Sequence, residues 1–414
     1  MTLAVKRSSS ISKIINDKGI ITHFQPIVSV KKKSVIGLEA LSRGICPDSG
    51  GILPPNTLFS LAEENNLTLD LDRLCRQKAM ENFNSLDLKN RDIILFMNFD
   101  TSIIDLGIVG SGHLLNQVRQ LNLNPNNVVI EIIESRVNDT RALNEFINRH
   151  REYGFLFALD DIGSGYSNLD RITITKPDLL KIDRSLISGI DINYHKQEVL
   201  KSLVNLAKRI GTLVVAEGVE REDEAITSLE LGVDMLQGFY FSRPMAMLGN
   251  DLQVFKERIN LISDKFKNYM VNKINDAKYR HMRYQTIANH IIHNLSAVNS
   301  GAYNALLKDL ISQHPNLECI YLLDEQGIQI SDTFCNYRNI LSHRGSIFRP
   351  APKGADHSLK DYYYLLTNTG MQRFTTAPYI SLASGNLCIT ISTLFKVPEN
   401  DRRYILCIDL NQNL

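Results

Sequence analysis

Short apolar runs alternate with amphipathic segments from the N-terminal region to about residue 245. Runs typical of strands lie at 23–30, 34–41, 93–98, 128–134, 155–159, 179–183, 213–217 and 235–241. Apolar residues at helical spacing separate them, at 56–65, 70–85, 113–121, 140–153, 196–210 and 222–231. Strands that alternate with helices form a parallel sheet covered by helices, so this pattern predicts an α/β fold with a closed, TIM-like (β/α)8 barrel. The basic turn Lys31–Lys33 joins the first two runs as a hairpin, which makes one strand antiparallel.

After Pro244 the pattern changes. Apolar residues spaced by three and four predict a long, largely polar helix, whose apolar seam packs either on the chain's own domains or on a second copy: Leu252, Phe255, Ile259, Ile262, Phe266 and Tyr269. From Leu317 an antiparallel α+β pattern follows, with strands expected at 319–323, 328–331, 373–377, 387–395 and 404–410. We therefore expect four segments: an N-terminal extension (1–18), a barrel domain (19–246), a helical linker (247–312) and an α+β domain (313–414).

Composition narrows the class of protein. The 414 residues include 46 Lys and Arg against 45 Asp and Glu, a net charge of +1, which gives no electrostatic basis for binding a nucleic acid polymer. No apolar run approaches the roughly 18 residues that a membrane span needs, and residues 1–10 lack the apolar core of a secretory signal. The six cysteines show no C-x-x-C spacing, which favours free thiols in a reducing compartment. We expect a cytoplasmic protein.

Acidic and amide residues follow the predicted strands. Asp160 and Asp161 end one strand, directly before the turn Gly163-Ser164-Gly165. An Asp-Asp-x-Gly sequence is also ordinary turn and helix-cap chemistry, but polar residues end the other strands too. The full set is Glu39, Asn98, Glu131, Asp160, Asp161, Asp183, Glu217 and Gln237. Because the C-terminal strand ends of a barrel converge on one face, we expect these side chains to meet.

Carboxylates and an amide, without Cys or His, form an oxygen-rich site that suits Mg²⁺ or Mn²⁺ and not zinc. Several carboxylates on one face repel each other unless cations lie between them, so we expect two ions bridged by a shared Asp, an arrangement that serves phosphodiester hydrolysis. Lys181 points the same way as Asp183 and could hold water or phosphate. Alternatively, Lys181 only pairs with a structural acid. Arg43 could clamp a phosphate.

These residues resemble the EAL-domain family in order and spacing. The motifs are Glu39-Ala40-Leu41 with Arg43, Asn98, Glu131 to Glu134, Asp160-Asp161 with Gly163 to Tyr166, Lys181-Ile182-Asp183, Glu217 to Glu220, and Gln237-Gly238. The resemblance extends from His23 to Pro244. It implies a cyclic-di-GMP phosphodiesterase on a TIM-like barrel, which hydrolyses the cyclic dinucleotide to linear 5′-pGpG with two Mg²⁺ or Mn²⁺ ions.

Carried over position by position, the resemblance implies a role for each of these residues. The first metal ion is assigned to Glu39, Asn98, Glu131 and Asp160. The second is assigned to Asp160, Asp161 and Glu217, with Lys181 orienting the nucleophilic water. The substrate and its surroundings are assigned to Gln25, Leu41, Arg43, Asp183, Glu220 and Gln237. Glu134 and the loop that begins Gly163-Ser164-Gly165 correspond to an element that couples metal binding to dimerisation, which implies a homodimer.

Mild departures from the family pattern leave the activity open. Ile162 stands where the family usually has Phe, and Ser164 and Ile133 stand where Thr is common. Gly44 takes the position after Arg43, where the family often has an aromatic residue. None of them removes a ligand, so an active enzyme is the favoured interpretation. The alternatives are a weak or inactive cyclic-di-GMP receptor, and a barrel enzyme that acts on another phosphate ester.

The C-terminal domain resembles a PAS-like or cache-type sensor in the order of its elements, including Tyr362-Tyr363-Tyr364 and Ala377-Pro378-Tyr379. That resemblance implies regulation by an unknown small ligand, with Arg373, Tyr363 and Tyr379 as possible contacts, although aromatic core packing also explains the tyrosines. His290 and His293 are spaced as a metal pair, but no third ligand accompanies them.

Overall fold

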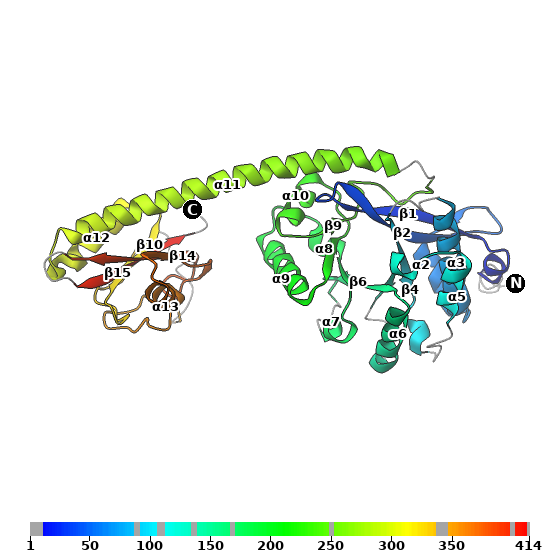
Figure 1. Ribbon diagram of the computed structural model, residues 1–414, viewed down its shortest axis with the longest axis horizontal. Coiled ribbons are helices and arrows are strands. Elements are labelled where there is room, and N and C mark those ends of the chain that lie inside the picture. Colours follow the sequence, from blue (N-terminus) through cyan, green and yellow to red (C-terminus); the bar gives the residue numbers. More distant parts are fainter. Residues whose placement is uncertain are drawn as a thin grey trace. The chain divides into compact units, whose positions relative to one another are not determined.

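The first half of the chain folds into a closed barrel (Figure 1). The computed structural model describes residues 11–86, 92–105, 112–133, 139–165, 170–247, 252–336, 347–397 and 402–411. The sheet order is β1-β9-β8-β7-β6-β5-β4-β2, with β1 also paired to β2 and short β3 attached to β2. Strand β1 runs antiparallel to β2 and β9, and the other barrel neighbours are parallel. The predicted eight-stranded barrel with one antiparallel strand is confirmed.

Most elements that the pattern predicts have observed bounds close to the expected ones, and four short elements were not predicted: β3, α4, α7 and α8. The strands of this sheet are β1 (Ile20–Ser29), β2 (Ser34–Ile45), β3 (Ile52–Leu53), β4 (Ile94–Phe99), β5 (Val128–Ile132), β6 (Leu156–Ile162), β7 (Leu179–Ile182), β8 (Leu213–Ala216) and β9 (Met235–Leu236). Its helices are α2 (Pro55–Glu64), α3 (Thr68–Ser85), α4 (Ser102–Asp105), α5 (His113–Gln120), α6 (Thr140–Glu152), α7 (Asp170–Thr175), α8 (Arg184–Ile187), α9 (Tyr194–Ile210) and α10 (Glu222–Glu230).

Local sequence signals set several of the helix ends. Asp139 caps α6 by accepting hydrogen bonds from the backbone amides of Arg141 and Ala142, each at 3.0 Å. Asn193 caps α9 in the same way, and Gly211 ends that helix at φ 78°, in the left-handed region that glycine enters without steric cost. Apolar positions between such caps face the sheet, and their packing on its outer surface forms the largest buried cluster.

The strand predicted at 235–241 is shorter than expected, because the chain turns at Gly238 after β9. A Cβ at this position would lie 2.1 Å from the carbonyl oxygen of Val219 and 2.3 Å from its nitrogen. The adjoining backbone groups are bonded, with Val219 N donating to Gln237 O at 3.0 Å and Tyr240 N donating to Val219 O at 3.0 Å. Glycine therefore allows two chain segments at the open end of the barrel to touch backbone to backbone.

The chain divides into two units, Met1–Asn272 and Lys273–Leu414. Helix α11 (Leu252–Ser296) begins in the first and ends in the second. The second unit holds an antiparallel sheet of order β11-β10-β15-β14-β12, with β13 paired to β14. Its elements are α12 (Tyr303–Gln313), β10 (Leu317–Leu323), β11 (Phe334–Cys335), α13 (Asp361–Asn368), β12 (Arg373–Thr375), β13 (Tyr379–Ile380), β14 (Leu387–Lys396) and β15 (Arg403–Asn411). A second, α+β sheet domain is thus present, while the four segment boundaries stay predictions.

One predicted strand of the second unit is wrong. Residues 328–331 form only isolated bridges, Leu323 to Gln329 and Ile328 to Asp356. The hairpin begins as expected, since Asp324 N donates to Ile328 O at 2.9 Å. Ile330 N also donates to Leu322 O at 2.9 Å, but Leu322 N donates to the side-chain Oγ of Ser331 at 2.9 Å and not to a backbone carbonyl, so the ladder ends there. Within the described ranges, helices that combine the length and the apolar character of a membrane span are absent.

The sheet of the second unit buries two carboxylates. Asp409 is 3% exposed and accepts a hydrogen bond from Oγ1 of Thr390 at 2.7 Å. Burial raises its pKa to about 7. Burial, together with the nearby charge of Asp409, also raises the pKa of Glu318 to about 7. Both groups thus bind protons more tightly in the folded chain than in the unfolded one.

Replacing Gly238 by Ala should destabilise the barrel. The added methyl overlaps the Val219 backbone, and overpacking of this kind costs about 1–3 kcal/mol. Denaturant unfolding followed by circular dichroism measures the loss. Gly19→Ala is the matched control, because its Cβ would have no neighbour closer than 3.6 Å. Equal stability of the two variants would contradict the packing argument.

Replacing Asp409 by Asn should stabilise the second unit at high pH. The folded pKa of about 7 exceeds the ordinary 3.8, so the parent loses stability as the pH rises from about 4 to about 7. Asn keeps the acceptor for Thr390 without the charge, and the gain above pH 7 is at most about 4 kcal/mol. Unfolding midpoints between pH 4 and pH 8.5 measure it. The control is Asp309→Asn, at an exposed position of α12. If the stability of Asp409→Asn fell with rising pH as much as that of this control, the assignment would be contradicted.

Candidate functional site

The polar residues at the strand ends project into the barrel because each follows an interior apolar residue by two positions. One interior layer consists of Ile27, Phe96, Val129, Ala158, Leu179, Val215 and Met235. Side chains alternate along a strand, so the next inward positions toward the C-terminal ends of the parallel strands are Asn98, Glu131, Asp160, Lys181, Glu217 and Gln237. Gln25 takes the same place on antiparallel β1, directly across the ladder from Glu39. Most of the expected set meets in space: Glu39, Asn98, Glu131, Asp160, Asp161, Glu217 and Gln237. Asp183 instead caps α8.

Asp160 and Asp161 are neighbours that both reach this site, which simple alternation forbids. The β6–β7 register shifts between Leu159 and Ile162, and Asp161 has φ 59°, in the left-handed region. This irregularity turns the second carboxylate toward the first. One carboxylate oxygen from each of Asp160, Asp161 and Glu217 lies within 4.8 Å of the other two. A backbone conformation that costs energy at a cluster of like charges is typical of functional sites.

The ammonium group of Lys181 lies at the centre of four carboxylates. Its Nζ is 2.7 Å from Oε1 of Glu131 and 2.7 Å from Oε1 of Glu217. Oε2 of Glu39 lies at 3.5 Å and Oδ1 of Asp160 at 3.6 Å. Lys181 is only 1% exposed. The lysine is therefore a structural counter-ion in this arrangement, whatever further role it has.

One ammonium cannot neutralise four carboxylates, and the pKa values reflect this deficit. Burial, followed by the charge of Glu39, raises the pKa of Glu131 well above its ordinary range. Burial and the charge of Asp160 do the same to Glu217, and burial raises the pKa of Asp160 itself. For Lys181 burial acts downward, but the four carboxylates prevail and raise its pKa well above its ordinary value.

Glu39 is held by two amides. Nδ2 of Asn98 donates to its Oε1 at 3.1 Å, and Nε2 of Gln237 donates to its Oε2. The same Gln237 nitrogen lies 3.2 Å from Oε1 of Gln25, whose own Nε2 donates to Ser242 O at 3.0 Å. Burial would raise the pKa of Glu39, but Lys181 and the two amides outweigh it and lower that pKa. Glu39 thus holds a proton less tightly than the other carboxylates around Lys181.

The donor set fits divalent cations that prefer oxygen. All the converging groups are carboxylates or amides apart from Lys181, as Mg²⁺ and Mn²⁺ require. Oε2 of Glu131, a buried oxygen, has no hydrogen-bond donor among the described residues. The excess negative charge and this oxygen both match a site that is completed by cations. Asp160, Asp161 and Glu217 are one group of carboxylates that could hold such a cation.

The other predicted site residues lie around this centre. Leu41 and Arg43 continue the inward face of β2, and Nη1 of Arg43 donates to Ser42 O at 2.9 Å. Asp183 caps α8 by accepting from Ser185 N at 2.9 Å, and Glu220 pairs with Arg184 at 3.1 Å. Gly163, Ser164 and Gly165 follow β6 and are exposed. Glu134 lies outside the described residues.

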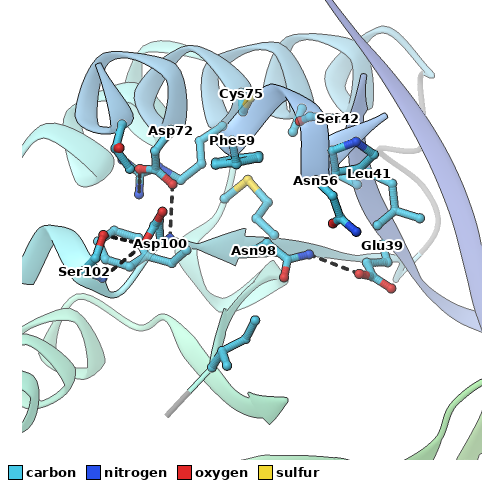
Figure 2. Close-up of a pocket in the computed structure, with 18 of the residues that line it drawn as sticks. Glu39, Leu41, Ser42, Asn56, Phe59, Asp72, Cys75, Asn98, Asp100 and Ser102 are labelled. Atoms are coloured by element: carbon cyan, nitrogen blue, oxygen red, sulfur yellow. Dashed lines mark hydrogen bonds and ion pairs between the residues drawn. The ribbon is translucent and has the colours of Figure 1, made fainter. Parts of the chain in front are cut away.

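A cavity of about 750 Å³ opens beside Glu39 and Asn98 (Figure 2). Strands β2 and β4 and helices α2 and α3 supply its walls. Its lining includes residues that the sequence did not single out: Asn56, Phe59, Asp72, Arg76, Asp100 and Ser102. Asn98 points from this wall toward Glu39 (Figure 2). The cavity and the carboxylates thus share a border.

A buried ion pair lies on the far side of the cavity from Glu39. Nη1 of Arg76 is 2.7 Å from Oδ2 of Asp72, and both residues are buried. Asp100 N donates to Oδ1 of Asp72 at 3.2 Å, and the Arg76 guanidinium lies 4.5 Å from the Phe99 ring centre. Burial raises the pKa of Asp72 to about 6. The i, i+4 spacing of opposite charges was visible in the sequence but is common on exposed helices, so it did not identify a cavity.

Comparison with known proteins places the chain. The model of the family described as EAL domain matches residues 8–244, more than half of the chain. Signaling protein YkoW of Bacillus subtilis is 28% identical over 251 residues, 59% of this chain and 30% of that protein. The uncharacterized EAL-domain containing protein YkuI of Bacillus subtilis is 27% identical over 408 residues, 96% of this chain and 95% of that protein. Cyclic di-GMP phosphodiesterase RocR of Pseudomonas aeruginosa is 31% identical over 228 residues, 54% of this chain and 57% of that protein.

Solved structures agree in fold. The crystal structure of Bacillus subtilis YkuI, in complex with substrate c-di-GMP and calcium, aligns over 100% of both chains with a TM-score of 0.78 at 23% identity. The manganese and cyclic di-GMP complex of Klebsiella pneumoniae BlrP1 aligns with a TM-score of 0.51 at 30% identity, over 56% of this chain and 57% of that one. The chain spans 30% of YkoW, about half of RocR and BlrP1, and nearly all of YkuI. On the family match over residues 8–244, this protein belongs to the EAL-domain family.

Proposed function

We propose that this protein is a metal-dependent phosphodiesterase that hydrolyses cyclic di-GMP to linear 5′-pGpG. One observation carries the proposal: the four carboxylates around Lys181 adjoin Asp161 and border a cavity of about 750 Å³. A relative named as a cyclic di-GMP phosphodiesterase and a neighbour solved with manganese and cyclic di-GMP support it.

Two Mg²⁺ or Mn²⁺ ions, when bound, would supply the positive charge that the carboxylates lack and would acidify the attacking water. The protein's own residues then have separate tasks. The ions would be held by Glu39, Asn98, Glu131, Asp160, Asp161 and Glu217, and the carboxylates of this set keep the site anionic without substrate. Lys181 donates a hydrogen bond that orients the attacking water. Attack on phosphorus breaks one P–O3′ bond, the water oxygen stays on the phosphate, and its proton leaves with the 3′ oxygen.

The cavity supports a substrate larger than a simple phosphate ester. Its volume beside Glu39 gives room for one nucleotide while the phosphate lies at the strand ends. Its polar lining offers donors and acceptors to a base edge, and Phe59 offers a planar contact surface. The rest of the substrate site is proposed to be lined by Gln25, Leu41, Arg43, Asp183, Glu220 and Gln237.

We assign the second unit a regulatory role, as a PAS-like or cache-type sensor for a small ligand. Its separate α+β sheet and its own buried core are compatible with such a domain. Arg373 donates to Oδ1 of Asn289 on α11 at 2.7 Å, which would couple a change near β12 to that helix. Cytoplasmic location and a homodimer belong to the same proposal.

A receptor that binds cyclic di-GMP without cleaving it would use the same pocket. Ile162 and Ser164, which differ from the usual residues of the family, lie next to Asp161 in the chain, so the non-catalytic receptor is the second candidate function. Formation of product decides between them. Turnover of other phosphate esters, without turnover of cyclic di-GMP, would instead identify a different barrel enzyme.

Replacement of Glu39 by Ala should abolish hydrolysis. It removes a carboxylate from the proposed first ion and also removes the acceptor that the Asn98 and Gln237 amides share. Incubation with cyclic di-GMP and Mn²⁺, followed by chromatography for pGpG, should show at least about a 100-fold loss relative to the parent. Glu222→Ala, which removes an exposed partner of Lys265, is the control and should retain full activity. Activity that survives in Glu39→Ala would refute the metal assignment, and a parent that binds without turnover would establish the receptor.

Replacement of Lys181 by Met should make folding depend on divalent cations. Loss of a buried partner typically costs about 3–5 kcal/mol, because the carboxylates around it stay buried. We expect a lower melting temperature in chelator and a larger rise on adding Mn²⁺ than in the parent. Lys31→Met, at a half-exposed salt bridge 3.9 Å long with Asp234, is the matched control. A Mn²⁺-induced rise no larger than that of the control would mean that Lys181 is not the counter-ion.

A further inference from the structure

Two cysteines face each other across the β10–β11 ladder of the second unit. The register pairs Cys319 directly with Cys335, and Asn336 N donates to Glu318 O at 2.8 Å. In an antiparallel ladder, a bond one residue beyond the pair marks a position where the two opposed residues exchange no backbone hydrogen bonds. Their Cα atoms are then about 4.5 Å apart, within the range that a disulfide spans.

The two thiols are also in contact. Directly opposed residues of an antiparallel pair project to the same face of the sheet, and these two are 0% and 6% exposed. A hydrogen bond between the thiols, followed by burial, raises the pKa of Cys319. The remaining cysteines of this unit have other neighbours: Cys407 lies beside Tyr321, and Cys388 beside Tyr379. Cys319 and Cys335 therefore differ from the other two cysteines of this unit in that their sulfur atoms are neighbours.

We propose that Cys319 and Cys335 are a reversible oxidation site that forms an intramolecular disulfide with a peroxide. One thiolate attacks a peroxide oxygen, the O–O bond breaks, and a sulfenic acid and a water result. The second thiol attacks that sulfur, the S–S bond forms, and a second water leaves. Two electrons pass from the sulfurs to the peroxide, both thiol protons end in water, and a dithiol reverses the bond.

The position of the pair sets how fast it reacts. Strand β11 is only Phe334–Cys335 and lies at the edge of the sheet, next to β10 alone. A short edge strand opens locally at lower cost than a central one, and only opening exposes both thiols to a solute. We therefore expect slow oxidation in buffer and faster oxidation in mild denaturant. The closed disulfide would fix β11 on β10.

The test uses the full chain with Cys46→Ser, which removes the half-buried thiol of the first unit and leaves five cysteines. After hydrogen peroxide treatment and unfolding, thiol titration should fall from five to three per chain, and dithiothreitol should restore five. The oxidised chain should weigh two hydrogen atoms less. Peptide mapping without reductant should show one cross-linked pair that joins the peptides of Cys319 and Cys335, and this requires no further variant.

A second variant, Cys46→Ser with Cys335→Ser, should form no cross-link within the chain under the same treatment and should lose at most one of its four thiols, because oxidation of Cys319 then stops at the sulfenic acid. The matched control, Cys46→Ser with Cys388→Ser, should fall from four to two. Thiols that all survive peroxide in the parent background would overturn the proposal. A cross-link that maps to other cysteines, or one found only between chains, would overturn it as well.

Discussion

The ion pairs of Lys181 are the interaction on which the open end of the barrel depends. Its Nζ lies within 3.6 Å of carboxylates on β2, β5 and β6 and of Glu217, the residue that follows β8. A single side chain of β7 thus joins five of the eight barrel strands. Such a cluster is costly, because each buried charge loses its hydration. Burial is the main reason why the pKa values of Glu131, Asp160 and Glu217 are raised, and the neighbouring acids add to it because one cation is too few for them. The same deficit makes this site receptive to divalent cations.

The barrel provides this arrangement through its geometry. Parallel strands bring their C-terminal ends to one rim, and alternation sends every second side chain inward. The apolar layer that includes Phe96 and Met235 fills the interior of the barrel. The polar side chains two residues further along the strands therefore lie at the rim. Antiparallel β1 contributes Gln25 from the opposite chain direction, and that amide holds Gln237 beside Glu39. The carboxylates are thus positioned by strands and held by amides.

The second unit shows a different use of buried polar groups. Its sheet encloses Glu318, Asp409 and a pair of thiols within a short distance along β10 and β15. None of these groups belongs to the barrel or to its chemistry. Buried carboxylates reduce the stability of a domain at neutral pH, and an edge strand of two residues adds little to it. A domain of this kind is responsive to proton and redox conditions, which suits the regulatory role proposed for it.

The sequence alone determined the eight barrel strands, the longer helices, their order and most of the inward polar positions, but not the short elements β3, α4, α7 and α8. Those features depend on local rules: strand alternation, helix periodicity, and caps such as Asp139 and Asn193. The sequence led us to expect both Asp160 and Asp161 in this site, but it did not show the register shift and the left-handed residue that bring two adjacent side chains together. Nor could it find the cavity at Asp72 or the pairing of Cys319 with Cys335. Cavities and cross-strand partners arise from contacts between residues far apart in the chain, and only the folded structure fixes those contacts.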